Sequence, residues 1–197
     1  MERCTILVNN CVLTVSQFIE LMNGGSDLPV PVRQGDVDAL CGIYALMNLQ
    51  RLQRDVETDP RDVEEDGLSV EAEFFVRALH AVASDTEGDL VKTVTEGLDA
   101  MDLIWLSTQL GGPKFKEVSP ATIESVANLL SKNKGVIVYF EGDDFTHYSV
   151  ALSADEKTGS LTLFDSWEFE QFSGGTLVRQ GGGPSVISVR MTKVLAT

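Results

Sequence analysis

The stretch QGDVDALCGIYALMN, residues 34–48, joins a polar segment that contains glycine to a run of apolar residues. The apolar residues that recur at helical spacing are Ile43, Leu46, Met47, Leu49 and Leu52. They predict the buried face of a helix over about 39–54, with Asp36 or Asp38 as its cap. Cys41 lies where the polar segment meets this helix.

Cys41 is the predicted nucleophile. The first turn of a helix presents backbone N–H groups without partners and the positive end of the helix dipole. This environment favours a thiolate over a thiol, and the thiolate is the form that attacks carbon. Cys4 and Cys11 lie in apolar surroundings, which predicts small and inert side chains.

His147 and Asp165 supply the other two groups that a thiol nucleophile needs. His147 follows a polar loop and opens a predicted strand that runs to Leu152. Asp165 directly follows a predicted strand over 160–164. In an antiparallel hairpin the start of one strand lies beside the end of the other, so the carboxylate is expected next to the imidazole. His80 falls within a helical pattern and receives no role.

Two more side chains are expected at the site. A tetrahedral intermediate needs hydrogen-bond donors for its oxyanion, and the candidates are the backbone N–H of Cys41 and the side-chain amide of Gln34. Trp167 follows Asp165 by two residues. Its ring is expected to cover the pair of His147 and Asp165 and exclude water, to pack in the core, or to do both.

The remaining pattern predicts one α+β domain over 1–197, with a helical part at about 16–131 and a sheet at about 135–197. Further helices are predicted over about 17–22, 69–83, 98–110 and 119–131, the last with Ser119 as N-cap and Pro120 as its first residue. Strands are predicted over 5–8, 12–15, 136–140, 147–152, 160–164 and 186–194. Gly174-Gly175 and Gly181-Gly182-Gly183 are expected to flank a loop before the last strand.

Negative charge dominates the composition. The formal net charge is −15, and the stretch from Asp55 to Asp99 holds 14 acidic and 3 basic residues, which makes −11 of that total. Such a surface repels nucleic acid and anionic lipid, so neither a nucleic-acid partner nor a membrane is expected. The acidic stretch is interpreted either as a solubilising surface or as a docking site for a basic partner.

Three cysteines without a CxxC pair argue against a disulfide framework and against structural zinc. A soluble protein of a reducing compartment is the simpler interpretation, either cytoplasmic or delivered into a host cytosol. The sequence shows neither a secretory signal nor an apolar run long enough to span a membrane.

Three islands of sequence resemble the papain-like (clan CA) cysteine peptidase superfamily: Gln34 with Cys41-Gly42-Ile43-Tyr44-Ala45, His147-Tyr148-Ser149-Val150, and Asp165-Ser166-Trp167. The third is similar to the Asn-Ser-Trp of papain-type enzymes. Its aspartate is more like the bacterial C39-type peptidases and the cysteine-protease effectors that some pathogens inject. The resemblance implies a nucleophile helix facing a sheet with the base, and cleavage of a peptide or isopeptide bond through a thioester on Cys41. It implies no metal or organic cofactor.

Two alternatives stay open. Transglutaminases, deamidases and arylamine acetyltransferases use the same three groups and also form a thioester, but they differ in whether water or an amine accepts the acyl group. The second alternative is an inactive binding module of the same fold, with the acidic stretch docking a basic partner. Three intact reactive groups favour an enzyme, whose partner is then a protein or peptide substrate.

Overall fold

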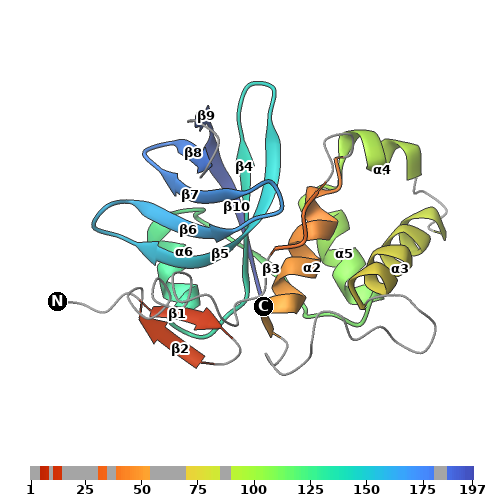
Figure 1. The fold of residues 1–197 in the computed structure, drawn as a ribbon, viewed down its shortest axis with the longest axis horizontal. Helices are drawn as coiled ribbons and strands as arrows, with labels where there is room; N and C mark the ends of the chain where they lie inside the picture. Colours follow the sequence, from red (N-terminus) through yellow and green to blue (C-terminus); the bar gives the residue numbers. More distant parts are fainter. Residues whose placement is uncertain are drawn as a thin grey trace.

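The computed structural model describes residues 5–8, 11–14, 31–34, 39–53, 70–84, 90–179 and 186–197. Within these residues the fold is α+β, with a curled antiparallel sheet and a group of helices at one side of it (Figure 1). None of the described helices has the length and apolar character needed to cross a bilayer.

One antiparallel sheet contains eight of the described strands, in the order β3-β10-β4-β5-β6-β7-β8-β9. Their bounds are β3 (Lys116–Val118), β4 (Val136–Glu141), β5 (Thr146–Asp155), β6 (Ser160–Phe164), β7 (Phe169–Ser173), β8 (Thr176–Arg179), β9 (Val186–Ser188) and β10 (Arg190–Ala196). A separate hairpin pairs β1 (Thr5–Val8) with β2 (Cys11–Thr14), as the sequence predicts.

The described helices divide between the two faces of the sheet. Their bounds are α2 (Cys41–Gln53), α3 (Val70–Ser84), α4 (Leu90–Glu96), α5 (Ala100–Gln109) and α6 (Ile123–Leu130). Helices α2, α3 and α5 share one core with residues such as Ile137 and Val150 of the sheet. Helix α6 packs into a second core, with Val138 and Ala151. Successive residues of a strand point to opposite faces, so the two cores lie on opposite sides of β4 and β5.

Helix α2 begins very close to the sheet. A Cβ added to Gly42 would lie 3.1 Å from Leu103 of α5 and 3.5 Å from Tyr148 of β5. A larger residue would press against Leu103 of α5, because the first of these distances is tighter than an ordinary contact. The absent side chain of Gly42 therefore lets the start of α2 pack closely against α5, with Tyr148 of β5 at an ordinary contact distance.

The predicted elements match the observed ones best where the apolar pattern is long. The helix expected over 39–54 is observed as α2, and the strand expected over 160–164 is β6. The predicted N-caps Asp36 and Asp38 and the helix expected over 17–22 lie outside the described residues.

Three local expectations are wrong, and some short elements were not expected. Helix α6 is capped by Thr122 and not by Ser119, because the Thr122 hydroxyl accepts the backbone N–H of Ser125 at 3.2 Å. The sequence interpretation missed α4 and the short strand β3. The loop expected between Gly174-Gly175 and the later glycines contains β8, which pairs with the unexpected strand β7, since Gly174 and Gly175 adopt positive φ angles of 57° and 78° and make a tight turn. The last predicted strand is divided into β9 and β10.

Removing a side chain from the helical core tests this packing. Leu103 is fully buried, so Leu103→Ala is expected to lower the free energy of unfolding by about 2–5 kcal/mol, measured by urea denaturation. The matched control is Met101→Ala on the same helix, where the side chain is 67% exposed and the expected change is within about 0.5 kcal/mol. Equal losses in the two variants would contradict the described core.

Candidate active site

Cys41 is the first residue of α2 and is 9% exposed. Its Sγ lies 4.0 Å from the backbone carbonyl oxygen of Ala39, the residue two positions before it. Ala39 is itself held by Val94 of α4, because its N–H donates to the Val94 carbonyl at 2.8 Å. The thiol is thus fixed at the N-terminal end of a helix of 13 residues, where backbone N–H groups have no helical partner.

His147 and Asp165 meet in the interior of the protein. The Nε2 of His147 lies 2.6 Å from Oδ2 of Asp165, and the exposed fractions of the two side chains are 1% and 0%. The two residues belong to neighbouring antiparallel strands, with His147 near the start of β5 and Asp165 directly after β6. This is the placement that the antiparallel hairpin predicts.

The carboxylate of Asp165 is fixed on its other side by the backbone. Its Oδ1 accepts the N–H of Trp167 at 2.7 Å and the N–H of Phe169 at 3.2 Å. These bonds close the turn from β6 into β7 around the carboxylate. Because the first oxygen is held by the turn, the second oxygen stays directed at the imidazole of His147.

The pKa of His147 is raised from 6.5 to about 10. Burial alone would lower it, but the negative charge of Asp165, the hydrogen bond with Asp165 and the contacts with Cys41 together outweigh burial. The imidazole is therefore charged at neutral pH and both ring nitrogens carry protons. Since Nε2 faces Asp165, Nδ1 is the nitrogen left to face Cys41.

Aromatic rings surround the imidazole. The ring of Trp167 stacks on that of His147 at 5.6 Å between centroids and 20° between planes. Phe145 and Phe169 lie 5.7 and 5.6 Å from the same ring. These rings exclude water from the His147–Asp165 pair, which strengthens their electrostatic interaction.

Gln34 lies beside the turn that follows Asp165. Its backbone N–H donates to the carbonyl of Ser166 at 3.0 Å, and the Ser166 hydroxyl donates to Gln34 Oε1 at 3.5 Å. Two residues earlier, Val32 is held by Asn48 of α2, whose Oδ1 accepts the Val32 N–H at 2.7 Å. The segment 31–34 thus connects the helix that carries Cys41 to the turn that carries Asp165.

The structure brings Cys41, His147, Asp165, Trp167 and Gln34 into one region, whereas His80 lies on an exposed part of α3. Sequence reasoning missed three of the residues that build this region. Phe145 and Phe169 gave no signal beyond being apolar. Asn48 did give a sequence signal, because it is a polar residue within the apolar stripe of a predicted helix. In the structure its side chain is only 1% exposed.

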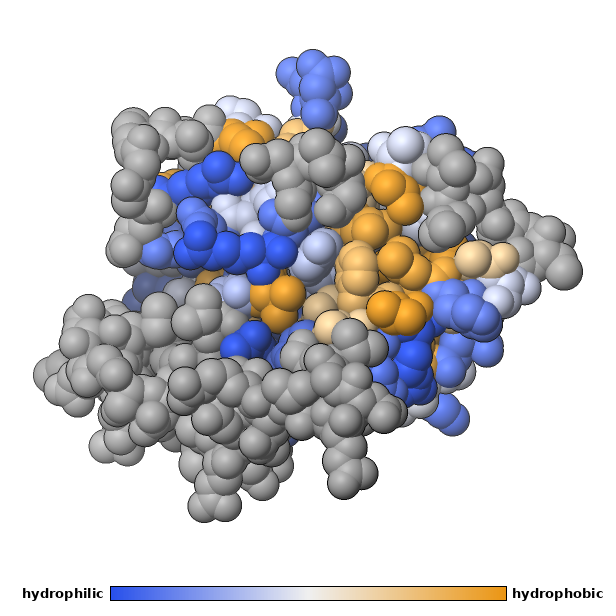
Figure 2. Space-filling model, turned by 45° about the vertical axis from the view of Figure 1, so that its right-hand side comes forward, coloured by the Kyte–Doolittle hydropathy of each residue, from blue (hydrophilic) through white to orange (hydrophobic). Residues whose placement is uncertain are grey.

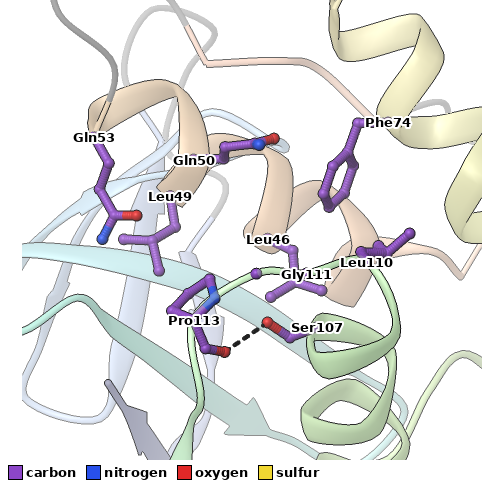
Figure 3. A pocket seen from close by; sticks show the side chains of 10 residues that line it. Leu46, Leu49, Gln50, Gln53, Phe74, Ser107, Leu110, Gly111 and Pro113 are labelled. Carbon is purple, nitrogen blue, oxygen red and sulfur yellow. Dashed lines mark hydrogen bonds between the residues drawn. The ribbon is translucent and has the colours of Figure 1, made fainter.

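A small cavity of about 60 Å³ lies elsewhere, at the opposite end of α2 (Figure 3). Leu46 and Leu49 of α2, Phe74 of α3 and Leu110 form its apolar wall. Leu49 follows Cys41 by eight residues, which is about 12 Å along a helix. The cavity therefore does not belong to the region around His147.

Part of the surface of the described helices is apolar. Figure 2 shows apolar residues gathered on the helical side of the molecule, and Val76 and Met101 are 56% and 67% exposed. No cluster of three or more His, Cys, Asp or Glu side chains suited to a metal ion occurs in the described ranges.

Comparison of the chain with protein-family models gives no match, and comparison with curated proteins gives none. The resemblance to papain-like peptidases therefore stays a prediction from the sequence, and the geometry around His147 is what carries the functional interpretation further.

The charge state of His147 is measurable by imidazole NMR, with His147→Gln used to assign its signals. The ring is expected to stay protonated from pH 6 to 8 and to titrate near pH 10. The pKa of His147 in the folded protein is raised above the unfolded value of about 6.5. The stabilisation that the pair contributes to folding is therefore fully present below pH 6.5 and is lost as the pH rises through about 10. Asp165→Asn is expected to lower the midpoint of the His147 titration, because burial lowers the pKa of the imidazole and the carboxylate that raises it is gone. A wild-type midpoint at or below 6.5 would contradict the pairing.

Proposed function

We propose that the chain is a papain-like cysteine peptidase that cleaves a peptide or isopeptide bond through a thioester on Cys41. The observation that carries the proposal is the buried His147–Asp165 pair in contact with a cysteine at a helix N-terminus. A surface histidine or a structural cysteine needs none of this arrangement. The helices at one side of a curled antiparallel sheet are compatible with a papain-like fold (Figure 1).

The chemistry needs a thiolate, a proton donor and an oxyanion site. The Cys41 thiolate attacks the carbonyl carbon, and the C–S bond forms as the electron pair of the C=O bond moves to oxygen. The charged His147 then gives its Nδ1 proton to the leaving nitrogen as the C–N bond breaks. A water attacks the thioester next; neutral His147 takes its proton, and the C–S bond breaks to restore the thiolate. Asp165 holds the ring and stabilises its charged form throughout.

The oxyanion is proposed to receive hydrogen bonds from the backbone N–H of Cys41 and the side-chain amide of Gln34. The bond between Gln34 and Ser166 supports this role, because it ties Gln34 to the turn next to Asp165. Trp167 is proposed to keep water away from the imidazole, which its stacking on His147 supports.

A free thiol at Cys41 fits a reducing compartment, and we propose that the protein acts there on a protein or peptide substrate. The acidic stretch from Asp55 to Asp99 is proposed to attract a basic partner or a basic region of that substrate.

Cleavage of a proteome-derived peptide library, read by mass spectrometry, tests the proposal. The wild type is expected to cleave a consistent set of sites, and Cys41→Ala to lose at least about 10⁴-fold in kcat/KM. Hydroxylamine or an added amine in the same reaction distinguishes hydrolysis from transfer, because an acyltransferase needs the amine to form product. No cleavage and no transfer by a folded wild type would favour the binding module.

Loss of the group that orients the base is expected to cost less activity than loss of the nucleophile. The fold loss in kcat/KM is expected to be on the order of 10 to 100 times smaller in Asp165→Ala than in Cys41→Ala, because Asp165→Ala disorients the base and keeps the nucleophile. The measurement is kcat/KM on one cleaved peptide, with circular dichroism as the control for folding. Near wild-type activity in Cys41→Ser would contradict a thiol mechanism.

A further inference from the structure

Arg179 lies over the aromatic rings that cover His147. It is the last residue of β8, and its Cζ is 5.7 Å from the ring centroid of Trp167 and 5.0 Å from that of Phe169. Arg179 and Phe169 are opposite residues of the paired strands β7 and β8, so the sheet fixes this position.

The positive charge of Arg179 has no acidic partner among the residues that the structure describes. Its Nε is buried and makes no hydrogen bond. The acidic residues of the nearby turn are already engaged, because Glu168 pairs with Arg33 at 2.6 Å and Asp165 binds His147. Within the described part of the chain, a half-buried arginine that pairs with no carboxylate is unusual.

The position of Arg179 relative to His147 indicates which part of a substrate it meets. Trp167 lies between the imidazole and the guanidinium. Its ring centroid is 5.6 Å from that of His147 and 5.7 Å from Cζ of Arg179. His147 gives its proton to the leaving nitrogen, so the leaving part of the substrate begins at the imidazole. An extended chain advances about 3.5 Å per residue, so two or three residues reach the guanidinium.

We propose that Arg179 determines specificity by binding a carboxylate in the first three residues after the scissile bond. The planar guanidinium accommodates a carboxylate in a bidentate pair, and its position over the rings of Phe169 and Trp167 keeps it oriented. An acidic side chain and a free C-terminal carboxylate offer the same chemistry. This inference rests on the proposed function, because it needs a substrate that reacts at Cys41.

Labelling of Cys41 by matched reagents tests Arg179 without a known substrate. The probes are the N-iodoacetyl derivatives of glycine, β-alanine and 4-aminobutyrate, each paired with its neutral carboxamide. For at least one chain length, the rate ratio of carboxylate to carboxamide is expected to be about fivefold lower in Arg179→Gln than in the wild type. Arg179→Lys is expected to keep part of the ratio, because it keeps the charge.

The design separates recognition from structural damage. The positive charge of His147 attracts every carboxylate reagent in both proteins, so a change in the ratio between proteins reports Arg179. Equal carboxamide rates in the two proteins show that Cys41, His147 and Trp167 are undisturbed. The labelled residue is identified by peptide mapping.

Two negative results have different meanings. If Cys41 reacts with the reagents and the ratio is the same in wild type and Arg179→Gln at every length, the carboxylate site is contradicted while the proposed function stands. If Cys41 of the folded wild type reacts with none of them, both the proposed function and the carboxylate site are contradicted.

The source of the carboxylate is then read from cleaved peptides in free and C-terminally amidated form. A preference that disappears on amidation indicates a terminal carboxylate, whereas one that survives and follows Asp or Glu indicates an acidic side chain. Either preference is expected to be lost in Arg179→Gln, and one that persists there would overturn the assignment to Arg179.

Discussion

The organisation of this protein depends on one buried ion pair, between His147 and Asp165. Removing two such groups from water is costly, and the cost is offset only where the charges touch and their remaining hydrogen bonds are made. The turn after β6 meets this condition, because Asp165 Oδ1 receives two backbone N–H groups and Oδ2 contacts the imidazole. The direction of the turn and the charge of the imidazole follow from this pair, and aromatic rings enclose it. Cys41 belongs to the other core and lies at the start of α2, where Gly42 lets the helix pack closely against Leu103 of α5.

The parts of the fold that the sequence predicts are those that local pattern controls. The apolar spacing from Ile43 to Leu52 predicts α2, and the two strands separated by a short polar loop place Asp165 beside His147 through antiparallel geometry alone. The helical and sheet parts follow from the same patterns. A hydrogen bond that follows from the topology of one hairpin requires no knowledge of the rest of the molecule.

The parts that the sequence does not predict depend on contacts between distant segments. Val32 binds Asn48, and Gln34 binds Ser166 across 132 residues, and in neither pair does the local sequence identify the partner. Arg179 is placed over Trp167 by the β7–β8 hairpin. The sequence interpretation missed both short strands, because it took Gly174-Gly175 for the edge of a loop and not for the turn of a hairpin. The seven-residue helix α4 is too short to show a period, although it fixes Ala39 next to the thiol. The candidate nucleophile is therefore visible in the sequence, whereas its surroundings are a property of the fold.

The most direct test of the account is the rate at which iodoacetamide labels Cys41 as a function of pH, in the wild type and in His147→Ala. The charged imidazole contacts the sulfur, so labelling at pH 6 is expected to be many times faster in the wild type than in His147→Ala. In His147→Ala the rate is expected to fall at pH 6 and to rise with pH like that of an ordinary thiol, whose pKa is about 8.5. A wild-type profile that matches the ordinary thiol and is unchanged in His147→Ala would contradict the ion pair, and with it the proposed chemistry.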